Sequence, residues 1–273
     1  MEASSPAKSN ILDTIKLDKA LRLAKQKSKD GHLQEAKNIC EDILQKYSKN
    51  KQALTVLQTL ADEYNSIANA QMKKGDSEVA IESYKQAISI KPDYAEAYYN
   101  LAILLERNGN PDAAIDSYKQ VLKIIPNYAG AYNNIGNTQK GMGDFEAAIS
   151  SYSRAVLIKP NYAEAYYNLG LTQHDKGDLK AAIGSYNDAL KIKPEYAEAY
   201  NNMGNAQKGE GDLDASINSY KRSIKIKPDY ANAYYNMGNA LKDKGELEAA
   251  VVYYKQAVKI TPNYFEAYSN MGV

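Results

Sequence analysis

The chain has 273 residues, a formal net charge of +1, one cysteine and no tryptophan. The near-neutral charge removes any global electrostatic case for nucleic acid or an anionic membrane, and a single cysteine excludes an internal disulfide framework. No run of about 18 apolar residues occurs, so the sequence predicts no membrane-spanning helix. We therefore expect a cytoplasmic, reduced protein with neither a nucleic-acid nor a membrane partner.

The N-terminal part of the chain differs from the rest. Residues 1–10 have no apolar core and are expected to form a disordered leader. Residues 11–60 are expected to hold a degenerate repeat, with helices over Leu17–Asp30 and Leu33–Lys46, followed by a helical insertion. Cys40 stands at a core position of the second helix and is predicted to be a small buried residue, not a reactive thiol.

The insertion joins the degenerate repeat to the regular part of the chain. It contains no glycine or proline, so we predict one long helix from about Lys51 to Lys73. Its apolar stripe is expected to begin with Leu54, Leu57 and Leu60.

Residues 61–264 repeat one pattern with a period of 34 residues, as in Ala163–Tyr196 and Ala197–Tyr230. Six copies keep the phase, and residues 265–273 begin a seventh, truncated copy. Within a copy, the Gly177-Asp178 pair separates two amphipathic helices and Pro194 ends the second. Two short helices cannot bury their apolar faces alone, so the copies must stack. The predicted fold is therefore all-α, an α-solenoid of stacked helix-turn-helix repeats.

The repeat resembles the tetratricopeptide repeat family in its period and in six positions of one copy: Tyr166, Gly170, Ala182, Tyr186, Ala189 and Pro194. The resemblance covers about nine-tenths of the chain and implies a right-handed solenoid. One departure recurs three residues after the small residue, where the family has an aromatic residue. This chain has Gln71, Leu105, Gln139, Gln173, Gln207 and Leu241 there. We expect the glutamine side chains to bond a tyrosine hydroxyl, the backbone or water.

Most of the 24 tyrosines fall at three positions of the repeat and are predicted to pack within and between copies. Three others recur only in every second copy, and we expect their helix face to differ from the core face. These are Tyr99, Tyr167 and Tyr235, which alternate with Asn133, Asn201 and Ser269. In tetratricopeptide arrays the first helices line a concave groove, so the resemblance places these rings in it as apolar anchors.

One asparagine recurs at the same place of this strip in six consecutive copies: Asn100, Asn134, Asn168, Asn202, Asn236 and Asn270. The pattern fails at Ser66 in the first regular copy and at Arg22 in the degenerate repeat. Further amides stand beside it at Asn69, Asn137, Asn205 and Asn239. A primary amide can pair with both the N–H and the C=O of a peptide, and a surface amide has no packing reason to recur. The set resembles the asparagine ladder in the superhelical domain of O-linked N-acetylglucosamine transferases, which implies a groove for protein substrates. An alternative is that the amides are inherited from duplication.

These observations favour a module that binds an extended peptide or protein partner in its groove, with no cofactor. A second hypothesis is the substrate-presenting arm of a larger modifying enzyme, such as a glycosyltransferase, whose catalytic part lies beyond residue 273. A third is self-assembly into a homo-oligomer through the truncated C-terminal repeat. No catalytic residue is predicted, because the sequence has no phosphate-binding glycine loop. His32 and His174 stand in different repeats without nearby cysteine, so no metal site is predicted either.

Overall fold

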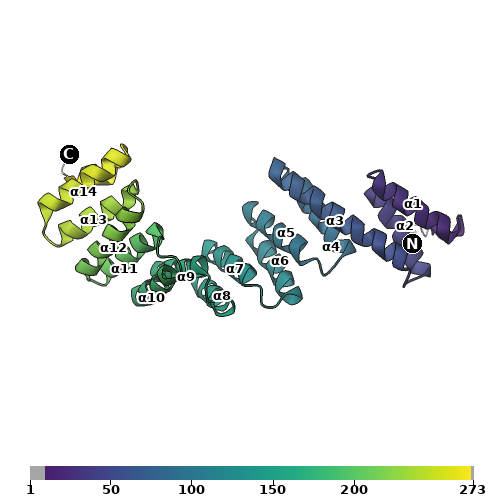
Figure 1. The fold of residues 1–273 in the computed structure, drawn as a ribbon, viewed down its shortest axis with the longest axis horizontal. Helices are drawn as coiled ribbons and strands as arrows, with labels where there is room; N and C mark the ends of the chain where they lie inside the picture. The colour runs from purple at the N-terminus through teal and green to yellow at the C-terminus, as the bar shows by residue number, and fades with distance from the viewer. Residues whose placement is uncertain (1–9, 272–273) are drawn as a thin grey trace, which may run out of the picture. The chain divides into compact units, whose positions relative to one another are not determined.

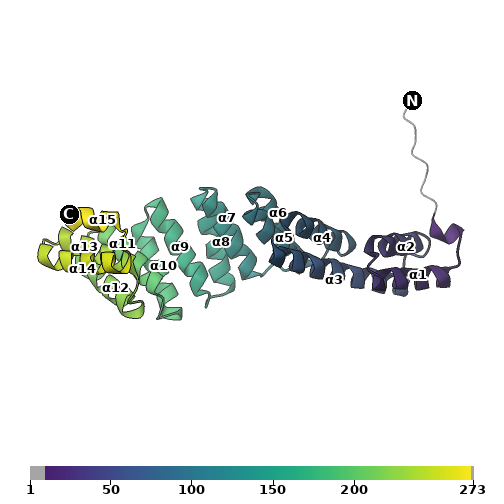
Figure 2. The same cartoon turned by 90° about the horizontal axis from the view of Figure 1, so that it is seen from above.

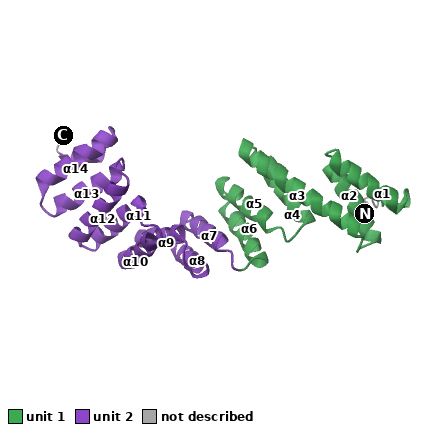
Figure 3. Ribbon diagram, in the orientation of Figure 1, with its two compact units in different colours: residues 1–126 green, residues 127–273 purple. Residues whose placement is uncertain are grey.

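Residues 10–271 are described by the computed structural model, and within this range the secondary structure is helical, with no strand. The chain divides into two compact units, residues 1–126 and 127–273 (Figure 3). Unit 1 contains the 3₁₀ helix η1 (Ile11–Asp13) and the α-helices α1 (Leu17–Lys29), α2 (Leu33–Lys46), α3 (Lys51–Lys74), α4 (Ser77–Ile90), α5 (Ala95–Arg107) and α6 (Pro111–Ile124).

Unit 2 contains the helices α7 (Ala129–Gly141), α8 (Phe145–Ile158), α9 (Ala163–Lys176), α10 (Leu179–Ile192), α11 (Ala197–Gly209), α12 (Leu213–Ile226), α13 (Ala231–Asp243), α14 (Leu247–Ile260) and α15 (Phe265–Met271). Within each unit every helix packs against the next along the chain, so helix pairs are stacked one after another (Figures 1 and 2). This is the α-solenoid arrangement that the 34-residue period predicts.

The turn between α9 and α10 follows from a Gly-Asp pair. Gly177 has φ of 91°, a left-handed conformation that glycine adopts without a steric cost, and it ends α9. The next backbone N–H, of Asp178, donates to the carbonyl of Gln173 at 2.9 Å. The Asp178 carboxylate then accepts from the N–H of Ala181 at 3.1 Å and caps the start of α10. Two adjacent residues thus end one helix and begin the next.

The centre of each regular repeat is a tyrosine of the second helix, and these six side chains are at most 1% exposed: Tyr84, Tyr118, Tyr152, Tyr186, Tyr220 and Tyr254. The first helix comes very close to this ring. A Cβ atom at Gly170 would lie 2.8 Å from Cδ1 of Tyr186, which is shorter than real side chains tolerate. Gly136, Gly204 and Gly238 have the same relationship to their tyrosines. In these four repeats glycine lets the two helices approach this closely, whereas the repeats of Tyr84 and Tyr118 have alanine, Ala68 and Ala102, at that place.

The N-terminal repeat forms a core of its own around α1 and α2. Cys40 is completely buried in it, and burial raises the pKa of the thiol to about 12, as expected of a packing residue. Of the leader predicted at residues 1–10, residues 1–9 lie outside the described part of the chain. Asn10 caps η1 by accepting from the N–H of Leu12 at 2.9 Å.

The long helix predicted at the insertion is α3, which has 24 residues and ends one residue later than predicted. Its N-terminal half packs into the core of α1 and α2, and Ala68 near its other end belongs to the core of α4 and α5. The predicted stripe is wrong at Leu54, which is 46% exposed, because Ala53 and Val56 face the core instead.

Candidate functional site

The recurring asparagines lie on the first helices of six repeats, α5, α7, α9, α11, α13 and α15, and all six are partly exposed. We call the surface they share within each unit the asparagine face. Unit 1 contributes Asn100, and unit 2 contributes Asn134, Asn168, Asn202, Asn236 and Asn270. These five side chains lie on consecutive first helices of one stack.

The second set of asparagines accepts hydrogen bonds from the core. Each Oδ1 atom receives the hydroxyl proton of the buried tyrosine in the same repeat. The O···O distances are 2.6 Å for Tyr84 to Asn69, 2.7 Å for Tyr152 to Asn137, and 2.8 Å for both Tyr220 to Asn205 and Tyr254 to Asn239. A buried hydroxyl needs a partner, so these amides satisfy the core. The premise that such amides have no packing reason is therefore wrong.

The amides of the asparagine face also donate to the preceding repeat. The Nδ2 bonds are Asn100 to Asn69 (3.1 Å), Asn168 to Asn133 and Asn137 (both 3.2 Å), Asn202 to Tyr167 (2.9 Å), Asn236 to Asn201 (3.0 Å), and Asn270 to Tyr235 (3.3 Å) and Asn239 (3.0 Å). These bonds tie each repeat to the one before it. The acceptor 35 residues earlier alternates between a buried asparagine and a tyrosine hydroxyl, because the chain alternates these residues with a two-repeat period. The acceptors 31 residues earlier are the asparagines that also bond the core tyrosines.

Because the Nδ2 groups donate to the preceding repeat, the asparagine face offers a ligand mainly hydrogen-bond acceptors, a property that we call its polarity. Both Nδ2 hydrogens of Asn168 are engaged, by Asn133 and Asn137, while no described residue donates to its Oδ1. The Oδ1 of Asn236 likewise has no donor within the described residues. An asparagine side chain has two donor hydrogens and one acceptor oxygen. Asn168 can therefore offer a ligand only its acceptor, and the expected pairing with both N–H and C=O is not available there.

Tyr167 and Tyr235 stand beside the asparagine face but pack on the core. The Tyr167 ring lies 6.0 Å from that of Tyr186 and 4.8 Å from that of Tyr196, between centroids. Tyr235 repeats these contacts, and the Tyr99 ring lies 5.6 Å from that of Tyr118. Burial raises the pKa of Tyr167 to about 12. The expectation that these rings avoid the core face is wrong, although each keeps a partly exposed edge.

Charged residues one turn further along the first helices also join neighbouring repeats. Lys140 pairs with Asp175 at 3.1 Å, and Lys208 pairs with Asp243 at 2.8 Å. Lys242 donates to the Oδ1 of Asn270 at 3.1 Å. All of these groups are partly exposed, so each pair contributes at most about 1 kcal/mol. They fix the register of neighbouring first helices and leave little net charge beside the asparagine face.

Two features of the repeat were missed in the sequence. Asn133 and Asn201 are buried, at 1% and 3% exposure, where they support the amides of the next repeat. The glutamines Gln139, Gln173 and Gln207 bond a serine hydroxyl of the second helix, Ser151, Ser185 and Ser219, at 2.6–2.7 Å. The partner of these three glutamines is therefore neither a tyrosine nor the backbone, and the buried Oε1 of Gln71 has no hydrogen-bond partner among the described residues. The constant spacing of twelve residues between glutamine and serine could have identified the pair.

Among the described residues no helix is long and apolar enough to cross a bilayer, and no three histidine, cysteine, aspartate or glutamate side chains gather closely enough to hold a metal ion.

Two family models match the chain. The model described as "TPR repeat" matches residues 68–109, 142–177, 173–211, 209–245 and 238–273. The model described as "Tetratricopeptide repeat" matches residues 95–128. A comparison with curated proteins gave no match.

Solved structures with the same fold include three of known name. The protein MamA is 30% identical with a TM-score of 0.58, and the match covers 63% of this chain and 93% of MamA. YrrB, described as "a TPR protein with an unusual peptide-binding site", is 23% identical with a TM-score of 0.61, covering 71% of this chain and all of YrrB. PilF of Pseudomonas aeruginosa is 19% identical with a TM-score of 0.64, covering 78% of this chain and 96% of PilF. The last two likenesses concern the fold alone.

Proposed function

The chain belongs to the tetratricopeptide repeat family, a family of protein-interaction modules, and from this premise we propose that its asparagine face binds an extended segment of a protein partner. The observation that carries the proposal is the free Oδ1 of Asn168 and Asn236 at the same place of two repeats. YrrB, which shares the fold and is described as having a peptide-binding site, is consistent with it.

The polarity of the face defines which part of a peptide it receives. Oδ1 atoms accept hydrogen bonds, so the ligand must supply donors, and every peptide carries backbone N–H groups at regular intervals. In an extended segment, alternate N–H groups point to the same side. One edge of the segment would therefore donate to the asparagine face whatever its side chains are. The exposed edges of Tyr167 and Tyr235 add apolar contact in alternate repeats.

The expected affinity is low for short peptides. Each neutral hydrogen bond contributes about 0.5–1.5 kcal/mol, whereas association itself costs at least about 4 kcal/mol. A segment that reaches only two or three repeats should thus bind in the micromolar range or more weakly. Longer segments should bind more tightly, because the cost of association is incurred only once.

The decisive experiment changes the peptide, so that the fold of the protein is untouched. Peptides selected from a random display library on wild-type protein are re-synthesised with single N-methyl groups along the backbone. Methylation removes one N–H donor. We expect methylation of the one or two N–H groups that face the free Oδ1 atoms of Asn168 and Asn236 to weaken binding about tenfold, because one hydrogen bond is lost in each case. Methylation at the other positions should change binding less than about twofold.

A uniform response would contradict the proposal. If no N-methyl group weakens binding, backbone donors are not what the face receives. If every position weakens binding equally, the peptide is held by its overall conformation and not by one edge. Self-assembly and a role as the arm of a larger enzyme stay predictions, which sedimentation equilibrium and the full reading frame would test.

A further inference from the structure

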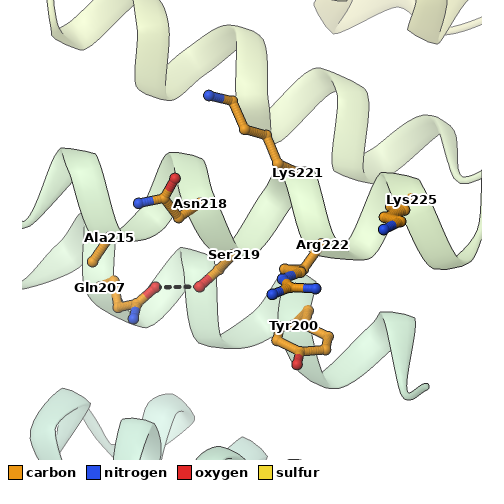
Figure 4. Close-up of a pocket in the computed structure, with 8 residues that line it drawn as sticks. All are labelled: Tyr200, Gln207, Ala215, Asn218, Ser219, Lys221, Arg222 and Lys225. Carbon is orange, nitrogen blue, oxygen red and sulfur yellow. Dashed lines mark hydrogen bonds between the residues drawn. The ribbon is translucent and has the colours of Figure 1, made fainter. Parts of the chain in front are cut away.

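A pocket between α11 and α12 lies away from the asparagine face (Figure 4). Its volume is about 780 Å³, and it is open to solvent. Gln207 forms part of its floor and accepts a hydrogen bond from Ser219 at 2.6 Å. In the next repeat the place of Gln207 is taken by Leu241, which is 5% exposed. The glutamine-serine pair therefore puts polar groups where that repeat has an apolar core residue.

Three cations of α12 surround this pocket, namely Lys221, Arg222 and Lys225. All three are exposed, and none forms an ion pair with a carboxylate in the described part of the chain. Other lysines of unit 2 do have such partners: Lys191 with Asp188, Lys208 with Asp243, Lys227 with Glu198 and Lys244 with Asp214. One carboxylate, Glu195, lines the adjoining pocket together with Arg222 and Lys225. The pocket thus keeps a net positive charge of two.

The remaining wall of the pocket consists of hydrogen-bond donors and one aromatic ring. Gln207 uses its Oε1 for Ser219, so its amide N–H groups are left for a ligand. Figure 4 shows the Arg222 guanidinium beside the Tyr200 ring. Two repeats earlier, Arg154 lies over the ring of Tyr132 with 6.0 Å to the centroid. The guanidinium of Arg222 has a planar fork of N–H groups that can make two parallel bonds to an oxyanion.

This combination occurs once among the repeats. Two other repeats have the glutamine-serine pair, and their second helices can be compared with α12 at the places of Lys221, Arg222 and Lys225. These places hold Ser153, Arg154 and Leu157 on α8, and Asn187, Asp188 and Lys191 on α10. The other pairs therefore carry one cation where α12 carries three. Lysines recur at the places of Lys221 and Lys225 on other second helices, as Lys119 and Lys123 on α6 and Lys255 and Lys259 on α14. What distinguishes α12 is therefore Arg222 between the two lysines, together with the glutamine-serine pair.

We propose that the α11–α12 pocket binds a phosphorylated serine or threonine side chain of a protein partner. A phosphomonoester carries nearly two negative charges near pH 7 and three strong acceptor oxygens, which match the net charge of two and the donors of Arg222, Lys225 and Gln207. A single carboxylate would neutralise only half of the charge. The pocket volume lies in the range of sites that hold small groups.

This site is separate from the asparagine face. Tyr200 and Asn202 are two residues apart on α11, a rotation of about 200° around the helix axis. The pocket therefore opens on the opposite side of α11 from Asn202. The inference goes beyond the proposed function, and the two can fail independently, because one concerns backbone donors and the other a phosphoryl group.

The test uses three fluorescein-labelled peptides of glycine and alanine that differ only in their central residue, which is phosphoserine, serine or glutamate. Fluorescence anisotropy measures binding to the wild-type chain, to Arg222→Gln/Lys225→Gln and to the control Lys255→Gln/Lys259→Gln. The control lysines are exposed and occupy the places on α14 equivalent to Lys221 and Lys225. Circular dichroism checks that every variant is folded. Side-chain amide signals in nitrogen-15 NMR spectra report whether Gln207 senses the peptide.

We expect the phosphoserine peptide to bind the wild type at least about tenfold more tightly than either other peptide, the effect of charge-assisted bonds. The α12 variant should lose this preference, the α14 control should keep it, and the Gln207 signal should shift. Equal binding of phosphoserine and serine would overturn the proposal, as would equal binding of phosphoserine and glutamate. Retention of the preference by the α12 variant, or NMR shifts confined to other helices, would place the phosphate elsewhere.

Discussion

The hydroxyl of Tyr152 donates to the Oδ1 of Asn137 at 2.7 Å, and that same Oδ1 receives an N–H of Asn168 from the next repeat at 3.2 Å. One amide oxygen thus joins the two helices of its own repeat and the following repeat. In a solenoid, where each repeat contacts only its neighbours, such bonds contribute to the interface terms that hold the stack together.

The repeat of α9 and α10 lacks this amide, and a first prediction follows. Leu171 takes the place of the asparagine, and the buried Tyr186 hydroxyl has no hydrogen-bond partner among the described residues. Tyr186→Phe should therefore leave stability unchanged or raise it by up to about 1 kcal/mol, because a desolvated hydroxyl is removed. Tyr220→Phe should lower it by about 0.5–1.5 kcal/mol, because the bond to Asn205 is lost. Urea unfolding followed by circular dichroism compares them, and an equal loss in both variants would contradict the account.

The glycines of the first helices give a second prediction. Gly170→Ala should destabilise the chain by about 1–3 kcal/mol, because the new methyl group would overlap the ring of Tyr186. Gly184 lies inside α10 with nothing within 4 Å of its missing Cβ, so Gly184→Ala should stabilise by about 0.4–1 kcal/mol. Both changes add one methyl group to a helix of the same repeat. Thermal unfolding of the two variants measures the difference. A similar shift of the melting temperature in both would show that helix propensity alone determines the effect on stability.

The order of helices and most of the core could be predicted from the sequence, because a period of 34 residues fixes where apolar positions recur. The turn at Gly177-Asp178 and the buried ring of Tyr186 depend on residues within one repeat, which lie close together in the sequence, so both could be predicted. The position of Leu54 was predicted wrongly, because a stripe of every third residue drifts around a helix and Ala53 and Val56 could fill the same core.

The site was less predictable, because its bonds connect residues about one repeat apart. Nothing in the neighbourhood of Asn168 shows that its Nδ2 atom reaches Asn133 and Asn137 of the preceding repeat. The sequence identified which positions recur. The direction in which each amide points depends on the stacking of repeats, and that direction decides whether the face offers donors or acceptors.

Alkaline pH gives a third prediction. Burial raises the pKa of Tyr84 and of Tyr167 to about 12, above the value near 10 expected in the unfolded chain. Between these values the unfolded chain has released protons that the folded chain still holds, so stability falls as pH rises. The contribution of these tyrosines to the free energy of unfolding should be constant below about pH 10 and fall steadily toward pH 12. Thermal melting from pH 8 to 12 together with tyrosinate absorbance checks this, and release of all tyrosine protons near pH 10 in the folded protein would contradict it.

The bonds between repeats give a fourth prediction, which concerns how binding experiments on the asparagine face must be interpreted. Asn168→Ala removes two hydrogen bonds to the preceding repeat and leaves Oδ1 of Asn133 without that donor. It should lower stability by about 1–3 kcal/mol. Asn218→Ala on α12 is the matched control, because this exposed amide makes no hydrogen bond to a described residue and alanine favours the helix. The midpoint of chemical unfolding should shift to lower denaturant concentration for Asn168→Ala and should remain unchanged or rise for Asn218→Ala.

If Asn168→Ala unfolds like the wild type, the amide is not part of the interface between repeats. A loss of binding in this variant would then report contact with the ligand alone. If it is destabilised as expected, only peptide N-methylation, which leaves the protein intact, separates ligand contact from support of the stack.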